Sequence, residues 1–250
     1  MKKIVKNFVH SLGWDLHRLS PSSNPSAQHL AAIKHVDANV VFDIGANVGQ
    51  FAQELRSVGF KGKIISFDPL TSAHEQLSLA ASRDPAWFVH PRVALGDRDG
   101  EIDINIAGNS VSSSVLPMLE AHSSAASGSA YVASERTPLV RLDSIATPYL
   151  DTDSRLFVKI DTQGFEWQVL DGSADTLKTA HGVLMEMSLV PLYEGQRLWR
   201  DVIVRMEKEG GAAPVFMTPD SVTFTHERSY AYGSKTIHRS LQSRSGSPGH

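Results

Sequence analysis

The sequence predicts an α/β fold: a single domain built on a mainly parallel, doubly wound sheet. Apolar runs of strand length alternate with segments of helical periodicity, which is the pattern of consecutive βαβ units. A chain of 250 residues is also long enough to bury one full core. The alternation begins with a strand at 39–45, "NVVFDIG", and a helix at 49–60.

The later elements continue this alternation with one interruption. Further strands are expected at 62–69, 87–97, 100–108, 155–161 and 181–188, and further helices at 72–83, 166–179 and 196–210. Between Ala107 and Val140 there are nine serines and little periodicity. This stretch predicts a serine-rich loop or insertion over the sheet edge, after the third strand.

The two ends of the chain differ from this pattern. Residues 1–39 are expected to form a helical segment packed on the domain, which itself spans 40–237. Ile4, Val5, Phe8, Val9 and Leu12 fall on one helical face flanked by lysines, so a weak membrane-surface helix is the alternative. The tail 238–250 has low complexity and is predicted to be disordered.

Composition excludes several classes of protein. A net charge of −3 and a pI near 6.4 argue against a nucleic-acid binder, which usually carries a strong basic excess. The absence of cysteine excludes disulfides, thiolate metal sites and cysteine nucleophiles, and it fits a reducing compartment, so we expect a cytoplasmic protein.

The loop after the first strand predicts a cofactor site. In a parallel sheet this loop lies at the carboxyl edge, where open α/β folds bind ligands. Gly45 and Gly49 favour close backbone approach, but their spacing is not the Gly-x-Gly-x-x-Gly of dinucleotide sites. S-adenosylmethionine carries a sulfonium and no phosphate, so an acid such as Asp43 beside this loop suits it better.

Two more acids follow strands. Asp68 ends the second strand, where it can accept both ribose hydroxyls, and Asp97 ends the third, where it can reach the adenine edge. Alternatively, Asp43 caps a helix and Asp68 caps a turn before Pro69. Because acids close three successive strands, we favour the cofactor site.

Seven segments, in chain order, resemble the FkbM family of S-adenosylmethionine-dependent methyltransferases. They are "VFDIGANVGQFA", "ISFDPL", "VALGDRDGEIDI", "SSSVL", "RLDSI", "VKIDTQGFEWQVLDG" and "LMEMSLVPLYEGQ", and they run from about Val40 to Gly210. The resemblance implies a class I methyltransferase (Rossmann-like) fold and O-methylation, usually of a sugar or polyketide hydroxyl in bacterial natural products and surface glycans.

The resemblance also implies roles for individual residues. The matching cofactor positions are Asp43, Gly45, Asn47, Gly49 and Asp68. The matching active-site positions are Asp161, Gln163, Glu166 and Glu186. Family members usually close with a strand resembling Asp-x-x-Phe-x-Arg, and 210–240 contains no such segment, so the sequence does not establish the last two strands.

The chemistry of these residues fits methyl transfer to a hydroxyl. Positioning provides much of the catalysis, and a base or a metal that removes the hydroxyl proton helps. Asp161 and Glu186 end adjacent strands, so they could act as base and orienter, or hold a divalent cation. Glu166 could instead favour a helix dipole, and His90 is expected to be a core histidine.

The sequence leaves alternatives open for the acceptor-binding wall and for the function. Ser112, Ser113 and Ser114 form either a flexible loop or a wall that hydrogen-bonds a sugar, and we favour the wall. A nicotinamide oxidoreductase and a non-catalytic protein that binds the cofactor or a glycan are the alternatives. The sequence does not indicate an oligomeric state.

Overall fold

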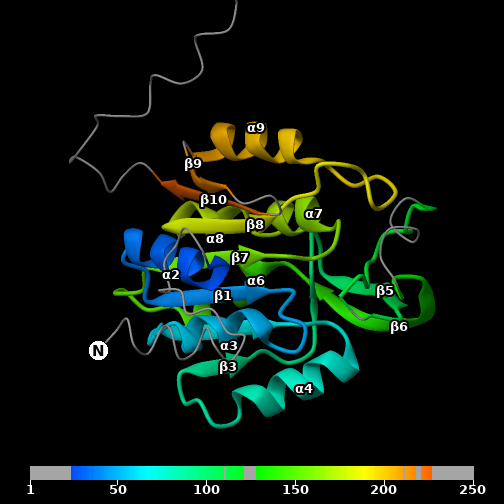
Figure 1. Cartoon of the computed structure of the whole chain (residues 1–250), viewed down its shortest axis with the longest axis horizontal. Coiled ribbons are helices and arrows are strands. Elements are labelled where there is room, and N and C mark those ends of the chain that lie inside the picture. Colours follow the sequence, from blue (N-terminus) through cyan, green and yellow to red (C-terminus); the bar gives the residue numbers. More distant parts are fainter. Residues whose placement is uncertain (1–23, 110, 121–127, 211, 218–220, 227–250) are drawn as a thin grey trace, which may run out of the picture.

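The computed structural model describes residues 24–109, 111–120, 128–210, 212–217 and 221–226. At its centre lies a seven-stranded sheet with strand order β3-β2-β1-β7-β8-β10-β9 (Figure 1). Its strands are β1 (Val40–Ile44), β2 (Lys63–Phe67), β3 (Trp87–Val89), β7 (Leu156–Ile160), β8 (Gly182–Glu186), β9 (Ala212–Met217) and β10 (Ser221–His226).

The direction of the strands creates a crossover beside β1. The pairs β1–β2, β2–β3, β1–β7 and β7–β8 are parallel, whereas β10 runs antiparallel to both β8 and β9. The chain goes outward from β1 to β3 and then returns to β7 on the other side of β1. Ligands of open α/β sheets bind at such a switch point, at the carboxyl ends of the strands.

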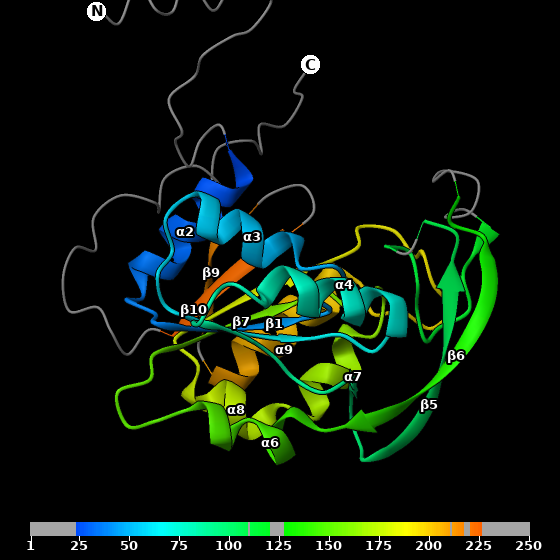
Figure 2. The same cartoon turned by 90° about the horizontal axis from the view of Figure 1, so that it is seen from below.

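Helices cover both faces of this sheet, which is why β1 and β7 are buried throughout (Figure 2). One face packs on α2 (Pro25–His35), α3 (Gln50–Ser57) and α4 (Thr71–Ala81). The other packs on α6 (Leu142–Ile145), α7 (Glu166–Asp171), α8 (Ala174–Thr179) and α9 (Trp199–Gly210), and a short 3-10 helix spans Thr147–Tyr149. The sheet is therefore doubly wound, as predicted.

A second, three-stranded sheet stands at one end of the molecule (Figure 2). It consists of β4 (Ala94–Leu95), β6 (Tyr131–Val140) and β5 (Gly100–Ala107), in that order across the sheet. The loop predicted for 107–140 was wrong in part, because its last ten residues form β6. Only two of the ten residues of β6 are buried, so it lacks the apolar alternation that marks a buried strand.

Two other predicted elements are divided in the structure. The strand expected at 87–97 is split between β3 in the large sheet and β4 in the small one. The helix expected at 166–179 breaks at Gly172, where a Cβ atom would lie 1.8 Å from the carbonyl oxygen of Gly96. Close packing of these two backbones therefore requires glycine and ends α7.

The chain ends are described only in part. The helix α2 begins at the N-cap Asn24, whose side chain accepts a hydrogen bond from Ala27 N at 2.8 Å, and packs on the domain through Leu30, Ala32 and Ile33. The predicted face at Ile4–Leu12 and the tail 238–250 lie outside the described residues. Both closing strands form, although the expected Asp-x-x-Phe-x-Arg segment is absent. In the described part of the chain, no helix has the length and apolarity needed to cross a membrane.

Candidate active site

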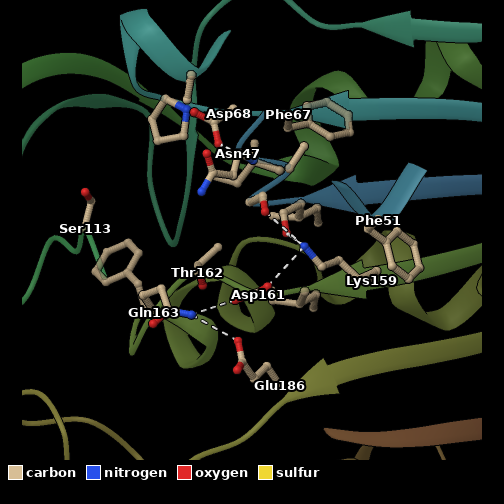
Figure 3. A pocket seen from close by; sticks show the side chains of 18 of the residues that line it. Asn47, Phe51, Phe67, Asp68, Ser113, Lys159, Asp161, Thr162, Gln163 and Glu186 are labelled. Atoms are coloured by element: carbon tan, nitrogen blue, oxygen red, sulfur yellow. Dashed lines mark hydrogen bonds and ion pairs between the residues drawn. The ribbon is translucent and has the colours of Figure 1, made fainter. Parts of the chain in front are cut away.

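A cavity of about 400 Å³ opens at the switch point (Figure 3). The carboxyl ends of β1, β2, β7 and β8 form its floor, and the segment 111–115 contributes a further wall. This volume lies within the usual range for small-molecule sites, roughly 300–1,000 Å³. The cavity also lies where the loops after parallel strands converge, as the sequence predicted.

The glycine loop after β1 is shaped by its contact with β7. Gly45 has φ of 71°, and a Cβ atom there would lie 1.8 Å from the carbonyl oxygen of Asp161. Gly49 has φ of 90° and packs against the Trp87 ring. Both glycines were predicted to admit a ligand, but the group that approaches each one is part of the protein. Gly45 also lines the cavity, whereas Gly49 lies behind its wall.

A buried lysine, which sequence reasoning missed, occupies the floor of the cavity. Lys159 Nζ lies 3.1 Å from Asp43 Oδ1 and 3.4 Å from Asp161 Oδ2, and it donates to the carbonyl oxygen of Gly45 at 2.9 Å. Burial alone lowers the pKa of Lys159, but the two carboxylates outweigh burial and hold this pKa above its usual value. A lysine within the apolar run "LFVKI" was the signal for it.

Asp43 lies one layer below the cavity. Its side chain is fully buried, it accepts a hydrogen bond from Ser66 Oγ at 3.3 Å, and Lys159 separates it from the cavity lining. Asp43 was predicted to contact a cofactor directly, but it does not line the cavity. Asp43 instead balances the charge of Lys159.

Asp161 and Glu186 meet at the ends of adjacent strands, as their positions predicted. Gln163 lies between them, and its Nε2 donates to Asp161 Oδ1 at 2.9 Å and to Glu186 Oε2 at 3.0 Å (Figure 3). Gln163 has φ of 54°, a backbone conformation that is costly for a residue other than glycine. Strain of this kind persists where the surroundings fix a residue, and it is common at functional sites.

The two carboxyl groups differ in protonation. Burial raises the pKa of Glu186, and the hydrogen bond with Asp161 and the negative charge of Asp161 raise it further, to about 9. For Asp161 burial acts in the same direction, but Lys159 together with hydrogen bonds from Glu186 and Gln163 holds the pKa below its usual value. At neutral pH the pair therefore shares one proton, with Asp161 ionised and Glu186 neutral. We call Asp161 and Glu186 the carboxyl dyad.

Asp68 and Asn47 form the opposite wall. The Asp68 carboxylate accepts hydrogen bonds from Asn47 N at 2.7 Å and Leu70 N at 3.0 Å, and burial raises its pKa to about 7. Asn47 has φ of 49°, and its buried Oδ1 has no hydrogen-bond partner among the described residues. The Asn47 side chain lines the cavity, so rotation of its amide can present this unsatisfied oxygen to a ligand that donates to it.

Glu166 supports the loop that carries Gln163. Its buried carboxylate accepts hydrogen bonds from Thr162 N at 3.0 Å and from Gly164 N at 3.1 Å, and it does not line the cavity. Two donors on one carboxylate fix the turn on both sides of Gln163. This arrangement makes Glu166 a positioning residue.

Asp97 and His90 lie outside the cavity lining. Asp97 follows β4 of the small sheet and pairs with Arg98 at 3.0 Å, so it does not end the third strand of the main sheet. His90 packs against Phe67, with ring centroids 5.3 Å apart, and its Nδ1 lies 2.7 Å from the carbonyl oxygen of Pro91. This is the packing role expected for His90.

The three serines separate into two groups. Ser113 and Ser114 line the cavity, and Ser114 Oγ donates to the carbonyl oxygen of Gln163 at 2.5 Å. Ser113 Oγ accepts from Ala107 N at 3.0 Å. Ser112 is buried outside the lining, and its carbonyl oxygen accepts from the Tyr193 hydroxyl at 3.2 Å. The segment predicted as a wall is thus anchored to the dyad loop.

A second side of the cavity was missed entirely. His29 of α2 lines it together with Gln50, Phe51 and Glu54 of α3. The His29 ring packs on Phe51 with centroids 5.5 Å apart, and its buried Nδ1 has no hydrogen-bond partner among the described residues. The signal was weak because His29 precedes every segment that resembles the family.

The dyad does not suit a divalent cation. A cation needs oxygen ligands, but the Lys159 ammonium and the Gln163 amide hydrogens face the Asp161 carboxylate, and Glu186 retains its proton. Among the described residues, no group of three His, Cys, Asp or Glu side chains is arranged to hold a metal.

Comparison with known proteins gives a family match. The model of the "Methyltransferase FkbM domain" matches residues 43–211. No curated protein matches the chain.

Solved structures of methyltransferases resemble the chain at low sequence identity. The methyltransferase domain of bacterial CtHen1-CN has a TM-score of 0.46 at 12% identity, covering 82% of this chain and 100% of that one. An O-methyltransferase from Bacillus cereus in complex with SAH has a TM-score of 0.40 at 11% identity, covering 89% of each chain.

Proposed function

The chain belongs to the FkbM methyltransferase family, and on that premise we propose that it transfers a methyl group from S-adenosylmethionine to a hydroxyl of a sugar or natural product. One observation carries this proposal. A carboxyl dyad with a single shared proton lies beside the glycine loop of a class I methyltransferase fold. Such a dyad can take up the proton that a hydroxyl loses when it is methylated.

The cavity lining suits the parts of this cofactor. Asp68 and Asn47 offer acceptors for the two ribose hydroxyls, and the apolar residues beside them can pack against adenine: Pro69, Leu70, Ala73, Val93 and Leu95. Glu54 offers a negative charge for the ammonium group of the amino-acid end. When bound, S-adenosylmethionine supplies a methyl group already activated by a sulfonium.

Charge complementarity supports the same assignment. The cavity is lined by the ammonium of Lys159, by the carboxylates of Glu54 and Asp161, and by Asp68, which ionises near pH 7, while Glu186 is neutral at that pH. Opposite charges attract more strongly where little water intervenes. The excess of carboxylates therefore favours a ligand of net positive charge, such as S-adenosylmethionine.

Asp161 is the base in this mechanism. It is ionised at neutral pH because Lys159 stabilises its negative charge. As the new carbon–oxygen bond forms and the carbon–sulfur bond breaks, the acceptor O–H bond also breaks and its proton passes to Asp161. Gln163 and Glu186 orient the carboxylate, and the neutral state of Glu186 avoids a second negative charge beside it.

The insertion supports a neutral acceptor. Val111, Ser113 and Val115 line the cavity, and the sequence 108–134 contains no Lys or Arg. Small hydroxyl side chains can donate to and accept from a polyol, whereas a phosphorylated acceptor favours a guanidinium.

We also propose that the protein acts in the cytoplasm, because a sequence without cysteine fits a reducing compartment.

The test uses two measurements on the purified protein. Calorimetry with S-adenosylhomocysteine and with NADH identifies the cofactor, and binding of NADH alone would favour an oxidoreductase. Mass spectrometry then follows methyl transfer to a panel of neutral glycosides and polyketide alcohols, with Asp161→Asn as the control. If S-adenosylhomocysteine binds and no hydroxyl acceptor is methylated, the non-catalytic alternative is the better explanation.

A further inference from the structure

Tyr193 is a buried tyrosine in the loop between β8 and α9. Its side chain is 1% exposed. Its hydroxyl oxygen lies 3.1 Å from Gln163 Oε1 and 3.2 Å from the carbonyl oxygen of Ser112. The hydroxyl therefore touches both the amide that joins the carboxyl dyad and the segment that forms the opposite wall.

The two ends of the Gln163 amide face groups of opposite hydrogen-bonding character. A carboxylate only accepts, so the Asp161 side of the amide needs the nitrogen, with its two hydrogens. The single proton of the tyrosine hydroxyl has two acceptors within reach, Gln163 Oε1 at 3.1 Å and the carbonyl oxygen of Ser112 at 3.2 Å, so with the amide nitrogen held by the carboxyl dyad the amide oxygen faces a donor on its other side. A flipped amide would direct its oxygen at an ionised carboxylate. Asp161 and Glu186 thus fix the nitrogen of the amide, and the Tyr193 hydroxyl supports the same orientation when it donates to the amide oxygen.

The surrounding backbone keeps Tyr193 in this place. A Cβ atom at Gly164, which has φ of 95°, would lie 2.9 Å from the tyrosine ring, so glycine leaves room for it. On the other side, Leu119 N donates to Leu192 O at 2.9 Å and Glu194 N donates to Pro117 O at 2.8 Å. The Gln196 side chain accepts from Tyr193 N at 3.3 Å. The ring is therefore held between the dyad loop and the insertion.

We propose that Tyr193 is a positioning residue for the carboxyl dyad, because its hydroxyl holds the Gln163 amide with the nitrogen toward Asp161 and Glu186. It acts through Gln163 and does not touch the reacting atoms. The orientation itself depends only on the contacts above, whereas its catalytic consequence rests on the proposed function. The two parts can be tested separately.

The orientation is tested in the unliganded protein by NMR. In a ¹H–¹⁵N spectrum, the Gln163 side-chain amide signals are assigned by their loss in Gln163→Leu. In Tyr193→Phe, we expect them to shift toward those of exposed glutamines and to exchange with water about tenfold faster, as expected for the loss of one hydrogen bond. Unchanged Gln163 signals in a folded Tyr193→Phe protein would overturn the proposal.

Tyr131→Phe is the matched control. The Tyr131 hydroxyl donates to the carbonyl oxygen of Leu116 at 2.6 Å and also interacts with the Ser114 side chain, so this change removes tyrosine hydrogen bonds from the same wall but no direct contact with the Gln163 side-chain amide. The Gln163 signals should stay unchanged in this variant. An equal shift in both variants would mean that loosening of the wall, and not the Tyr193 hydroxyl, moves the amide, and this result would also overturn the proposal.

The catalytic consequence is tested with a double-mutant cycle on turnover. Tyr193→Phe should lower kcat about tenfold with little change in cofactor affinity, and it should have no further effect in a Gln163→Leu background. Full additivity of the two changes would contradict action through Gln163. If no methyl transfer is found with any acceptor, the proposed function fails, and the NMR result still decides the orientation.

Discussion

The ammonium nitrogen of Lys159 lies 3.4 Å from Asp161 Oδ2, on the floor of the cavity. The same nitrogen lies 3.1 Å from Asp43 Oδ1, so one buried cation holds two carboxylates from adjacent strands. This relationship joins the glycine loop to the dyad, because Lys159 also donates to the carbonyl oxygen of Gly45. The charge state of the site and the stability of its floor should therefore change together.

The first prediction concerns this buried ion pair. Lys159→Met should lower the free energy of unfolding by about 3–5 kcal/mol, because it leaves Asp43 buried without its partner. Denaturant unfolding measures the loss. Adding Asp43→Asn should restore part of the stability, since the uncompensated charge is then removed.

Lys178→Met is the control for that prediction. Lys178 pairs with Asp175 at 2.7 Å, but both side chains are more than 60% exposed, so water screens the pair and its removal should leave the unfolding midpoint unchanged. Equal losses from the two lysine changes would show that burial of the Lys159–Asp43 pair is unimportant.

The second prediction concerns Asp68. Asp68→Ala should weaken S-adenosylmethionine binding by roughly 1.5–3 kcal/mol, because hydrogen bonds from the ribose to a carboxylate are lost. Burial raises the pKa of Asp68 to about 7, and the ionised form is the better acceptor. Affinity should therefore be greatest above pH 7 and decrease as the pH falls below it, and calorimetry should show no such decrease for Asp68→Asn. An unchanged affinity in folded Asp68→Ala would contradict the ribose assignment.

The third prediction separates the two members of the dyad. Asp161→Asn removes the ionised base and should lower turnover by about 10²-fold or more. Glu186→Gln resembles the neutral state that a pKa of about 9 gives Glu186 at pH 7, so this variant should keep most of its activity there. Initial rates from pH 6 to pH 9 measure both effects. The reverse order of sensitivity would make Glu186 the base.

The sequence predicted the parts of this site that follow from strand order. Asp161 and Glu186 were expected together because they end adjacent parallel strands, and Asp68 because it ends the second strand. Tyr193 and His29 contribute through tertiary contacts that no local pattern records, whereas Lys159 had a local signal, its place in the apolar run "LFVKI", that was overlooked. Asp97 was misplaced because the predicted third strand continues into a different sheet.

The fold shows the same division between local and tertiary information. The buried strands β1, β2, β7 and β8 have apolar runs and were predicted, whereas β6 has only two buried residues and was missed. The break between α7 and α8 depends on the contact of Gly172 with Gly96, more than 70 residues earlier in the chain. Helical periodicity within 166–179 cannot report such a contact.

The fourth prediction concerns His29 of α2. His29 lines the cavity beside Phe51 and Glu54, and its buried Nδ1 has no hydrogen-bond partner among the described residues. His29→Ala should weaken cofactor binding about tenfold, because a hydrogen bond to the amino-acid end and one wall of the site are lost. His35→Ala, an exposed histidine on the same helix, is the control in the same calorimetric titration. Equal affinities of the His29→Ala and His35→Ala proteins would remove α2 from the cofactor site.

The last prediction concerns the acceptor wall. Val111 lines the cavity and is 51% exposed, and Val132 on β6 is 70% exposed and lies outside the lining. Val111→Glu introduces a charge where we place a neutral acceptor. Because acceptor binding would then desolvate the new carboxylate, this change should raise the KM for the acceptor about tenfold. Cofactor affinity should stay nearly intact. Val132→Glu adds the same charge to the same hairpin and should change neither constant. If Val111→Glu instead weakened binding of S-adenosylhomocysteine and left the acceptor KM unchanged, residues 111–115 would belong to the cofactor side of the cavity, and the acceptor would have to enter from the side of α2.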